Sequence, residues 1–227
     1  MGIHRIPIRI VLVWILIEIF TLSACGSSMK KQVEIIDHQG YFTPKSYSTY
    51  TESHIVSEIR NNGSTNLMYI EILVTFYGQD GNIQNSDHAY ALVDILLPGE
   101  VSPFRIQQTT EENVSKYKIE IVNWRETDIQ PYKDFQILDQ TGEVDKLMDW
   151  YHIFGSYTNN GTSDANFTTV MATCYDKDGK VISVGWTGDT LVKPGEVKPF
   201  DIEVYPVFTT YKIVDCSVII SCENGKL

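Results

Sequence analysis

The most distinctive chemistry in this sequence belongs to its four cysteines, and the first of them stands in an unusual setting. Leu22-Ser23-Ala24-Cys25 follows an almost wholly apolar run over residues 10–20, and Arg5 and Arg9 give the chain a short basic start. Small residues before a cysteine fit the narrow cleft of a peptidase. A thiol is also a good nucleophile, so Cys25 could accept a diacylglycerol group.

This arrangement resembles the bacterial lipobox, because the basic start, the apolar run and the cysteine follow one another in register. The resemblance implies that residues 1–24 are a signal peptide and that Cys25 is the lipid-attachment residue. Residues 25–32 would then be a lipidated tether on the outer face of a bacterial cell membrane. The alternative is an uncleaved transmembrane helix. A span needs about 20 apolar residues, whereas this run is shorter and contains Glu18, a costly residue in lipid.

Three cysteines remain after Cys25, and an odd number excludes a complete disulfide framework. Cys216 and Cys222 are expected on one extended strand, too far apart to be bridged. Cys174 could pair with either Cys216 or Cys222, and buried thiols are the alternative. No Cys-x-x-Cys pair occurs, so neither a zinc site nor thioredoxin-like chemistry is expected.

The other polar motifs predict turns and not a reaction. Asp176-Lys177-Asp178-Gly179 has the start of a calcium loop but lacks the glutamate that completes an EF-hand. A hairpin turn explains it, as it explains Gln79-Asp80-Gly81. The histidines after residue 25 are scattered, and surface positions are expected for them. We therefore predict no catalytic residues, no metal and no cofactor.

The net charge of −11 excludes one class of partner. No basic cluster interrupts the acidic composition, so nucleic acid is not expected to bind.

Comparison of the chain with itself reveals two copies of one unit. Five blocks recur in the same order. They pair 33–37 with 135–139, 61–64 with 159–162, 76–81 with 174–179, 97–104 with 192–200, and Tyr117-Lys118-Ile119 with Tyr211-Lys212-Ile213. The blocks predict a first domain over residues 33–124, a linker over 125–134 and a second domain over 135–227.

Each unit has the pattern of a β-structure. Apolar residues alternate from Met68 to Phe76, which is the period of a strand. Pro98-Gly99 and Pro194-Gly195 are typical of type II turns. Short strands between turns favour a sandwich, and only Gly142 to Tyr151 could form a short helix.

The repeated Asn-Asn, Tyr with Asp-Gly, and Pro-Gly-Glu…Pro-Phe motifs are similar to the FxLYD domain, over both repeats. That family is an immunoglobulin-like β module of extracellular bacterial lipoproteins. The resemblance implies an all-β chain with two tandem immunoglobulin-like β-sandwich domains after the signal peptide. It implies an export-associated module that binds a ligand or acts as a spacer, and it implies no catalytic residues.

Tryptophans offer a further surface. Trp124, Trp150 and Trp186 could form an aromatic binding face, although Trp124 and Trp150 flank the linker and are expected to pack between the domains. We expect a non-catalytic binding or scaffolding module for a protein, a peptide or an envelope polysaccharide. The alternatives are a structural spacer or accessory subunit of an exported complex and, more distantly, an enzyme whose site is assembled from distant strands.

Overall fold

The computed structural model describes residues 32–43, 51–110, 114–222 and 225–226. These residues form antiparallel strands and one short 3-10 helix, η2 (Val207–Lys212), with no α-helix among them. The all-β prediction is therefore confirmed. No helix in the described part of the chain is long and apolar enough to cross a membrane. The predicted signal peptide, the predicted lipobox residues Leu22, Ser23 and Ala24, and the predicted lipid-attachment residue Cys25 lie outside the described residues.

The first sandwich contains two sheets, whose strand orders are β1-β2-β6 and β4-β3-β7, with β5 paired to one end of β3. Its strands are β1 (Val33–Phe42), β2 (Thr51–Asn61), β3 (Asn66–Tyr77), β4 (Ile83–Tyr90), β5 (Ile95–Leu96), β6 (Val101–Thr110) and β7 (Lys116–Thr127). Buried apolar side chains from both sheets fill the space between them.

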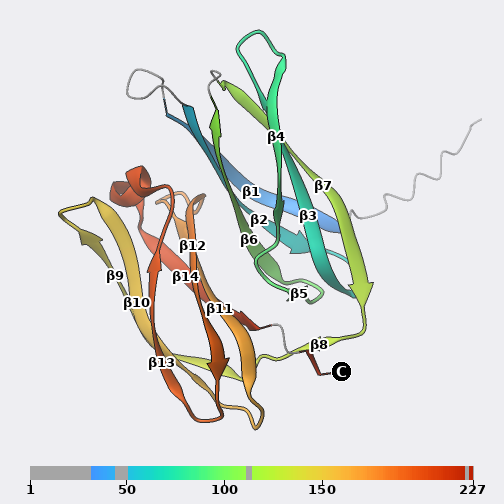
Figure 1. Ribbon diagram of the computed structural model, residues 1–227, viewed down its shortest axis with the longest axis vertical. Coiled ribbons are helices and arrows are strands. Elements are labelled where there is room, and N and C mark those ends of the chain that lie inside the picture. The colour runs from blue at the N-terminus through green and yellow to red at the C-terminus, as the bar shows by residue number, and fades with distance from the viewer. Residues whose placement is uncertain (1–31, 44–50, 111–113, 223–224, 227) are drawn as a thin grey trace, which may run out of the picture.

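The second sandwich repeats this topology, with sheets in the orders β9-β10-β13 and β12-β11-β14. Its strands are β9 (Phe135–Asp145), β10 (Trp150–Asn159), β11 (Ala165–Tyr175), β12 (Val181–Val192), β13 (Val197–Glu203) and β14 (Asp215–Cys222). In each unit the first two strands and the strand that follows the Pro-Gly turn form one sheet, as in immunoglobulin-like sandwiches. The chain passes between the units through β8 (Gln130–Pro131), which pairs with β15 (Gly225–Lys226) near the C-terminus (Figure 1).

The alternating pattern seen in the sequence places the core. On β3, Ile72, Val74 and Phe76 are buried, and on β11 Val170 and Ala172 are buried in the equivalent places. Because successive side chains of a strand point to opposite faces, this inward set leaves the intervening residues on the outer face of the same sheet.

A buried asparagine forms the same set of hydrogen bonds at equivalent positions of the two sandwiches. The Asn61 side-chain amide donates to the Thr65 and Leu96 carbonyl oxygens at 2.8 and 2.9 Å, and its side-chain oxygen accepts from the Gly63 amide at 3.0 Å. Asn159 makes the matching bonds, at 2.9 Å to the Ser163 and Val192 carbonyls and 3.0 Å from the Gly161 amide. The recurring Asn-Asn-Gly therefore ties three chain segments together, which is more than the turn expected from sequence.

Three details of the sequence interpretation differ from the structure. Gly142 to Asp145 belong to β9 and pair with β10, so the short helix considered possible over 142–151 does not form. The fifth repeat block is also wrong, because Tyr211 and Lys212 lie in η2 and Cys216 is the residue opposite Cys174. A triplet match is short enough to arise by chance in a connection of different length. Finally, β7 continues to Thr127, past the boundary expected at residue 124.

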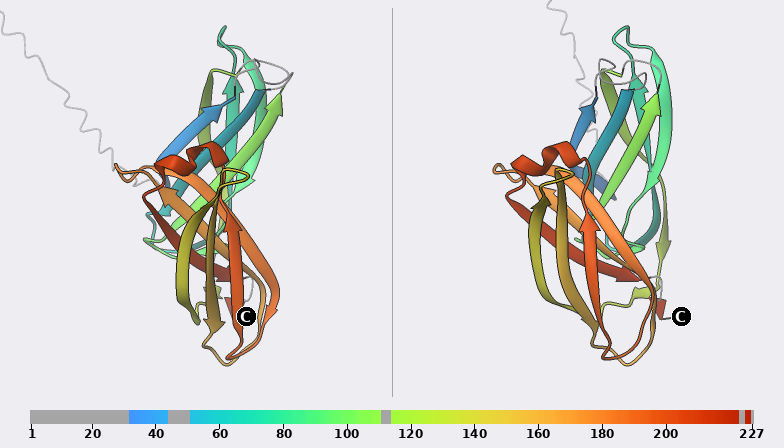
Figure 2. Two further views of the ribbon diagram at one scale, coloured as in Figure 1. Left: turned by 90° about the vertical axis from the view of Figure 1, so that its left-hand side faces the viewer. Right: turned by 60° about the vertical axis from the view of Figure 1, so that its left-hand side comes forward.

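The two sandwiches lie side by side with their sheets stacked in four layers (Figures 1 and 2). The outer face of β1-β2-β6 packs on the outer face of β12-β11-β14, and β12 contacts β1, β2 and β6. The junction between the sandwiches is therefore built from sheet faces and not from the linker alone.

Candidate functional site at the junction of the two sandwiches

The centre of the junction is a small apolar cluster. Val56 of β2 and Val181 and Val184 of β12 are all fully buried, and Tyr41, Leu92 and Tyr175 pack around them. Leu92 lies in the connection between β4 and β5, and the others occupy outward positions of their sheets. Burial of apolar area is stabilising by roughly 25 cal/mol per Å², so these side chains favour packing of one sandwich against the other.

Arg105 extends this contact from β6 across to the second sandwich. Its guanidinium lies 4.3 Å from the centre of the Trp186 ring and 4.6 Å from that of Tyr205. The Nη1 group also donates to the Val184 carbonyl oxygen at 3.3 Å. Cation–π pairs of this kind gain strength when they are partly shielded from water. Trp186, and not Trp124 or Trp150, is the tryptophan between the sandwiches; Trp150 instead stacks on His152 within the second sandwich.

Two carboxylates of the first sandwich accept hydrogen bonds across the junction. The Tyr175 hydroxyl donates to Glu58 Oε1 at 2.7 Å, and the Val181 amide donates to Asp37 Oδ2 at 2.7 Å. Burial, only partly offset by the Tyr175 hydrogen bond, raises the pKa of Glu58 above its usual value, and the charge of Asp37 adds to that rise. The position of Glu58 at the junction therefore disfavours the ionised form of its carboxyl group.

Among the described residues, two cavities open where the sandwiches meet. The first, of about 270 Å³, has mostly apolar walls, and a Glu100–Lys133 ion pair lies beside it. It is lined by Val93, Ile95, Glu100, Val101, Pro131, Tyr132, Lys133, Ile219, Ile220 and Ser221. The second, of about 260 Å³, is lined by Asp94, Phe167, Thr168, Thr169, Gly188, Asp189 and Thr190. Ser221 of the first cavity donates to Asp94 Oδ2 of the second at 3.2 Å, so this hydrogen bond links the two.

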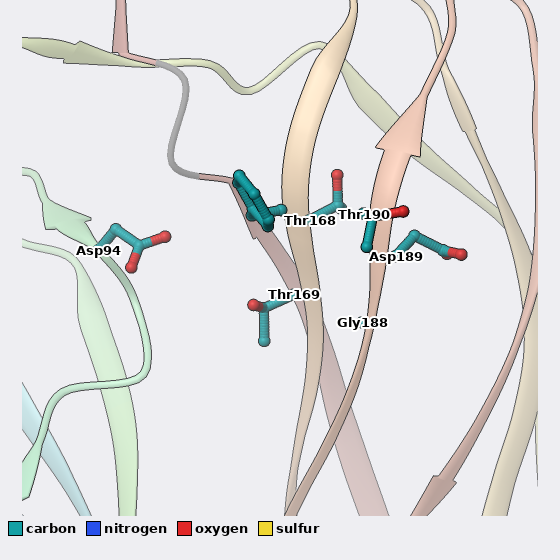
Figure 3. Close-up of a pocket in the computed structure, with 7 residues that line it drawn as sticks. Asp94, Thr168, Thr169, Gly188, Asp189 and Thr190 are labelled. Carbon is teal, nitrogen blue, oxygen red and sulfur yellow. The ribbon is translucent and has the colours of Figure 1, made fainter.

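The second cavity has polar groups on both sides of the junction. Asp94 points from the first sandwich toward Thr169 of the second, whereas Asp189 points away from Asp94 (Figure 3). Asp189 instead accepts a 2.7 Å hydrogen bond from the Tyr157 hydroxyl, and burial together with that bond raises the pKa of Tyr157. Asp94 is therefore the carboxylate that faces the cavity, whereas Asp189 forms its hydrogen bond within the second sandwich.

Phe167 is the exposed aromatic residue of this cavity, and its backbone is unusual. Its φ is +50°, in the left-handed region, and its side chain is 59% exposed. Tyr69 occupies the equivalent position in the first sandwich, with φ +51° and 60% exposure. A non-glycine residue in this region is uncommon and costs energy. The Arg125 guanidinium lies 4.7 Å from the centre of the Tyr69 ring.

The cysteines predicted as a possible pair are joined in one of the two ways considered. A disulfide connects Cys174 to Cys216, which stand opposite each other on β11 and β14 with Cα atoms 4.1 Å apart. Cys222 remains a buried thiol, and its Sγ atom lies 4.0 Å from the Tyr132 carbonyl oxygen.

The histidines and the Asp-Lys-Asp-Gly segment are accounted for by local contacts. Asp176 Oδ1 accepts from the Asp178 and Lys180 amides at 2.9 and 3.0 Å, as expected of a hairpin turn. His152 Nδ1 lies 2.8 Å from Asp201, while His54 is buried, contrary to the expected surface position. Within the described residues, no group of three or more histidine, cysteine, aspartate or glutamate side chains could hold a metal.

Sequence reasoning missed Arg105, which crosses the junction, and Asp94 and Phe167, which line its second cavity. One signal was available, since Tyr69 and Phe167 are separated by the same offset as Asn61 and Asn159. An aromatic residue at the same place in both repeats marks a position to inspect. Comparison with models of known protein families gave no match, and comparison with curated proteins gave no significant match.

Proposed function

We propose that this chain is a bacterial lipoprotein, anchored through Cys25, that displays a non-catalytic binding module outside the cell. The anchor rests on the order Leu22-Ser23-Ala24-Cys25 after an apolar run. The binding role rests on one observation above others: the sandwiches pack through their sheet faces and leave an open cavity between them that contains two carboxylates, three threonines and an exposed aromatic ring. Ligand sites commonly occupy such junctions.

The anchor is tested by membrane fractionation and intact-mass measurement of the wild type and Cys25→Ala. The wild type should lack residues 1–24, carry a lipid-sized mass and sediment with membranes. The variant should be released or left unprocessed. A wild-type mass that includes residues 1–24 without lipid would instead indicate an uncleaved anchor.

The binding role is tested separately on intact cells, with a photocrosslinking amino acid at Thr190 beside the cavity. Ile83, which is exposed on β4 of the first sandwich, provides the matched control position. Discrete adducts at Thr190 and none at Ile83 are expected of a binding module. Absence of adducts at both positions would favour the second candidate, a structural spacer, for which the firm packing at Arg105 is the supporting observation.

A further inference from the structure

The two repeats use the same strained aromatic position in different ways. In the first sandwich the chain's own Arg125 places its guanidinium over the Tyr69 ring, which is still 60% exposed, and its Nη2 group also contacts the Met68 sulfur at 3.0 Å. In the second sandwich the equivalent ring is Phe167. None of the described residues places a cation over that ring, and its side chain is 59% exposed.

The backbone at this position is expensive for an aromatic residue. A side chain in the left-handed region costs of order 1 kcal/mol, and glycine would avoid that cost. Both repeats nevertheless carry an aromatic residue there, with nearly identical φ values of +51° and +50°. The aromatic ring is therefore the useful part of this residue. In the first sandwich the ring binds a guanidinium group.

The surroundings of Phe167 add the groups that a cation needs. Asp94 shares the cavity with Phe167 and points toward Thr169 (Figure 3). A carboxylate and hydroxyl oxygens accept hydrogen bonds from a guanidinium or ammonium group, while the ring face attracts its charge. The cavity volume of about 260 Å³ is below the usual range for drug-sized ligands, which suits a single side chain.

We propose that this cavity binds an organic cation, specifically the arginine or lysine side chain of an extracytoplasmic peptide or protein. This inference rests on the proposed binding function and names its ligand class. The net charge of −11 favours the same partner, because an acidic protein attracts basic ligands and steers their approach. Tyr69 with Arg125 is the intramolecular version of the contact that Phe167 makes with its partner.

The first test uses N-acetylarginine amide as the probe and N-acetylcitrulline amide, its neutral isostere, as the control. Binding to the full mature protein is followed by the NMR shifts of the Thr169 and Thr190 amides. The arginine probe should shift these amides saturably, with a dissociation constant on the order of millimolar for one side chain. Binding should weaken as salt is raised, and the citrulline probe should cause no saturable shift. Equal binding of both probes would overturn the proposal.

Variants assign the binding to the cavity. Phe167→Gly removes the ring at a φ that glycine accepts, so the protein should remain folded and bind the arginine probe about tenfold more weakly. Asp94→Asn should weaken binding to a similar extent. Tyr69→Gly, the matched change in the first sandwich, should leave affinity unchanged. Full affinity in Phe167→Gly would contradict the proposal, and the melting temperature of each variant checks that it is folded.

A neutral probe separates failure of this inference from failure of the proposed function. If a trimer of N-acetylglucosamine binds in a Phe167-dependent manner and the arginine probe does not, the ligand class is wrong and the binding function stands. If neither probe binds and Thr190 gives no crosslinked adduct on cells, both the inference and the binding function are wrong.

Discussion

At the scale of single residues, the duplicated asparagines show how a polar side chain can specify a β-sandwich. Asn61 and Asn159 are both fully buried, yet each satisfies its side-chain amide and oxygen with backbone groups from two segments. The side chains of the following residues, Asn62 and Asn160, each donate one solvent-exposed hydrogen bond, to Glu34 and Gln136 respectively. Neighbouring asparagines in the same motif therefore have different tasks.

We expect Asn159→Ala to lower the free energy of unfolding by about 2–3 kcal/mol, because it leaves buried backbone groups without partners. Asn160→Ala, one residue away and exposed, should cost less than about 0.5 kcal/mol. Urea denaturation of the wild type and both variants measures the difference. Equal losses in the two variants would show that the buried network contributes little.

At the scale of elements, equivalent strand pairs of the two sandwiches are joined by different side-chain contacts. Phe76 stands opposite Tyr117 on β3 and β7, and Cys174 stands opposite Cys216 on β11 and β14. An aromatic pair in one copy therefore corresponds to a disulfide in the other. The disulfide closes a loop with a sequence separation of 42 residues.

Replacing both Cys174 and Cys216 by alanine should lower the free energy of unfolding by about 3–4 kcal/mol, since the cross-link restricts the unfolded chain. The matched control is Cys222→Ala, which removes a buried thiol outside the disulfide and should cost about 1 kcal/mol. Thermal unfolding under oxidising conditions compares them. A double variant as stable as the control would mean that the cross-link does not constrain the unfolded state.

The strands could be predicted from sequence because alternation and turn residues act locally. Met68 to Phe76 forms a strand as expected, and Gly99 and Gly195, with φ of +83° and +74°, occupy the left-handed turn positions. The junction could not be predicted, because it depends on which outer faces meet. Arg105 and Trp186 are 81 residues apart, and neither local sequence indicates that the two side chains meet.

At the scale of the whole molecule, the half-buried acid Glu58 links packing of the sandwiches to pH. Its folded-state pKa is raised, mainly by burial, so its protonated form is favoured in the folded protein. The stability from this group is fully present below the unfolded-state pKa. It is lost as pH rises through the higher folded-state pKa.

We therefore expect Glu58→Gln to become progressively more stable than the wild type as pH rises from the usual glutamate pKa into the raised range. The glutamine oxygen can still accept the Tyr175 hydroxyl, so the hydrogen bond is kept. Denaturation at a series of pH values measures the difference, and Glu126→Gln, at an exposed position of β7, controls for removal of one negative charge. A stability difference that does not change with pH would contradict this assignment.

The stacking of the sandwiches also bears on assembly, because the contact is heterologous: each copy offers a different sheet. Repeating the same operation would in principle add further copies into an open-ended filament. The equivalents of the contact residues oppose that growth. Asp201 stands where Arg105 does in the other repeat, and the equivalent of Trp186 is His88, which is paired with Glu71. An added copy would bring Asp201 toward the His88–Glu71 pair, in place of a guanidinium over an indole ring, so the cation–π contact would not recur.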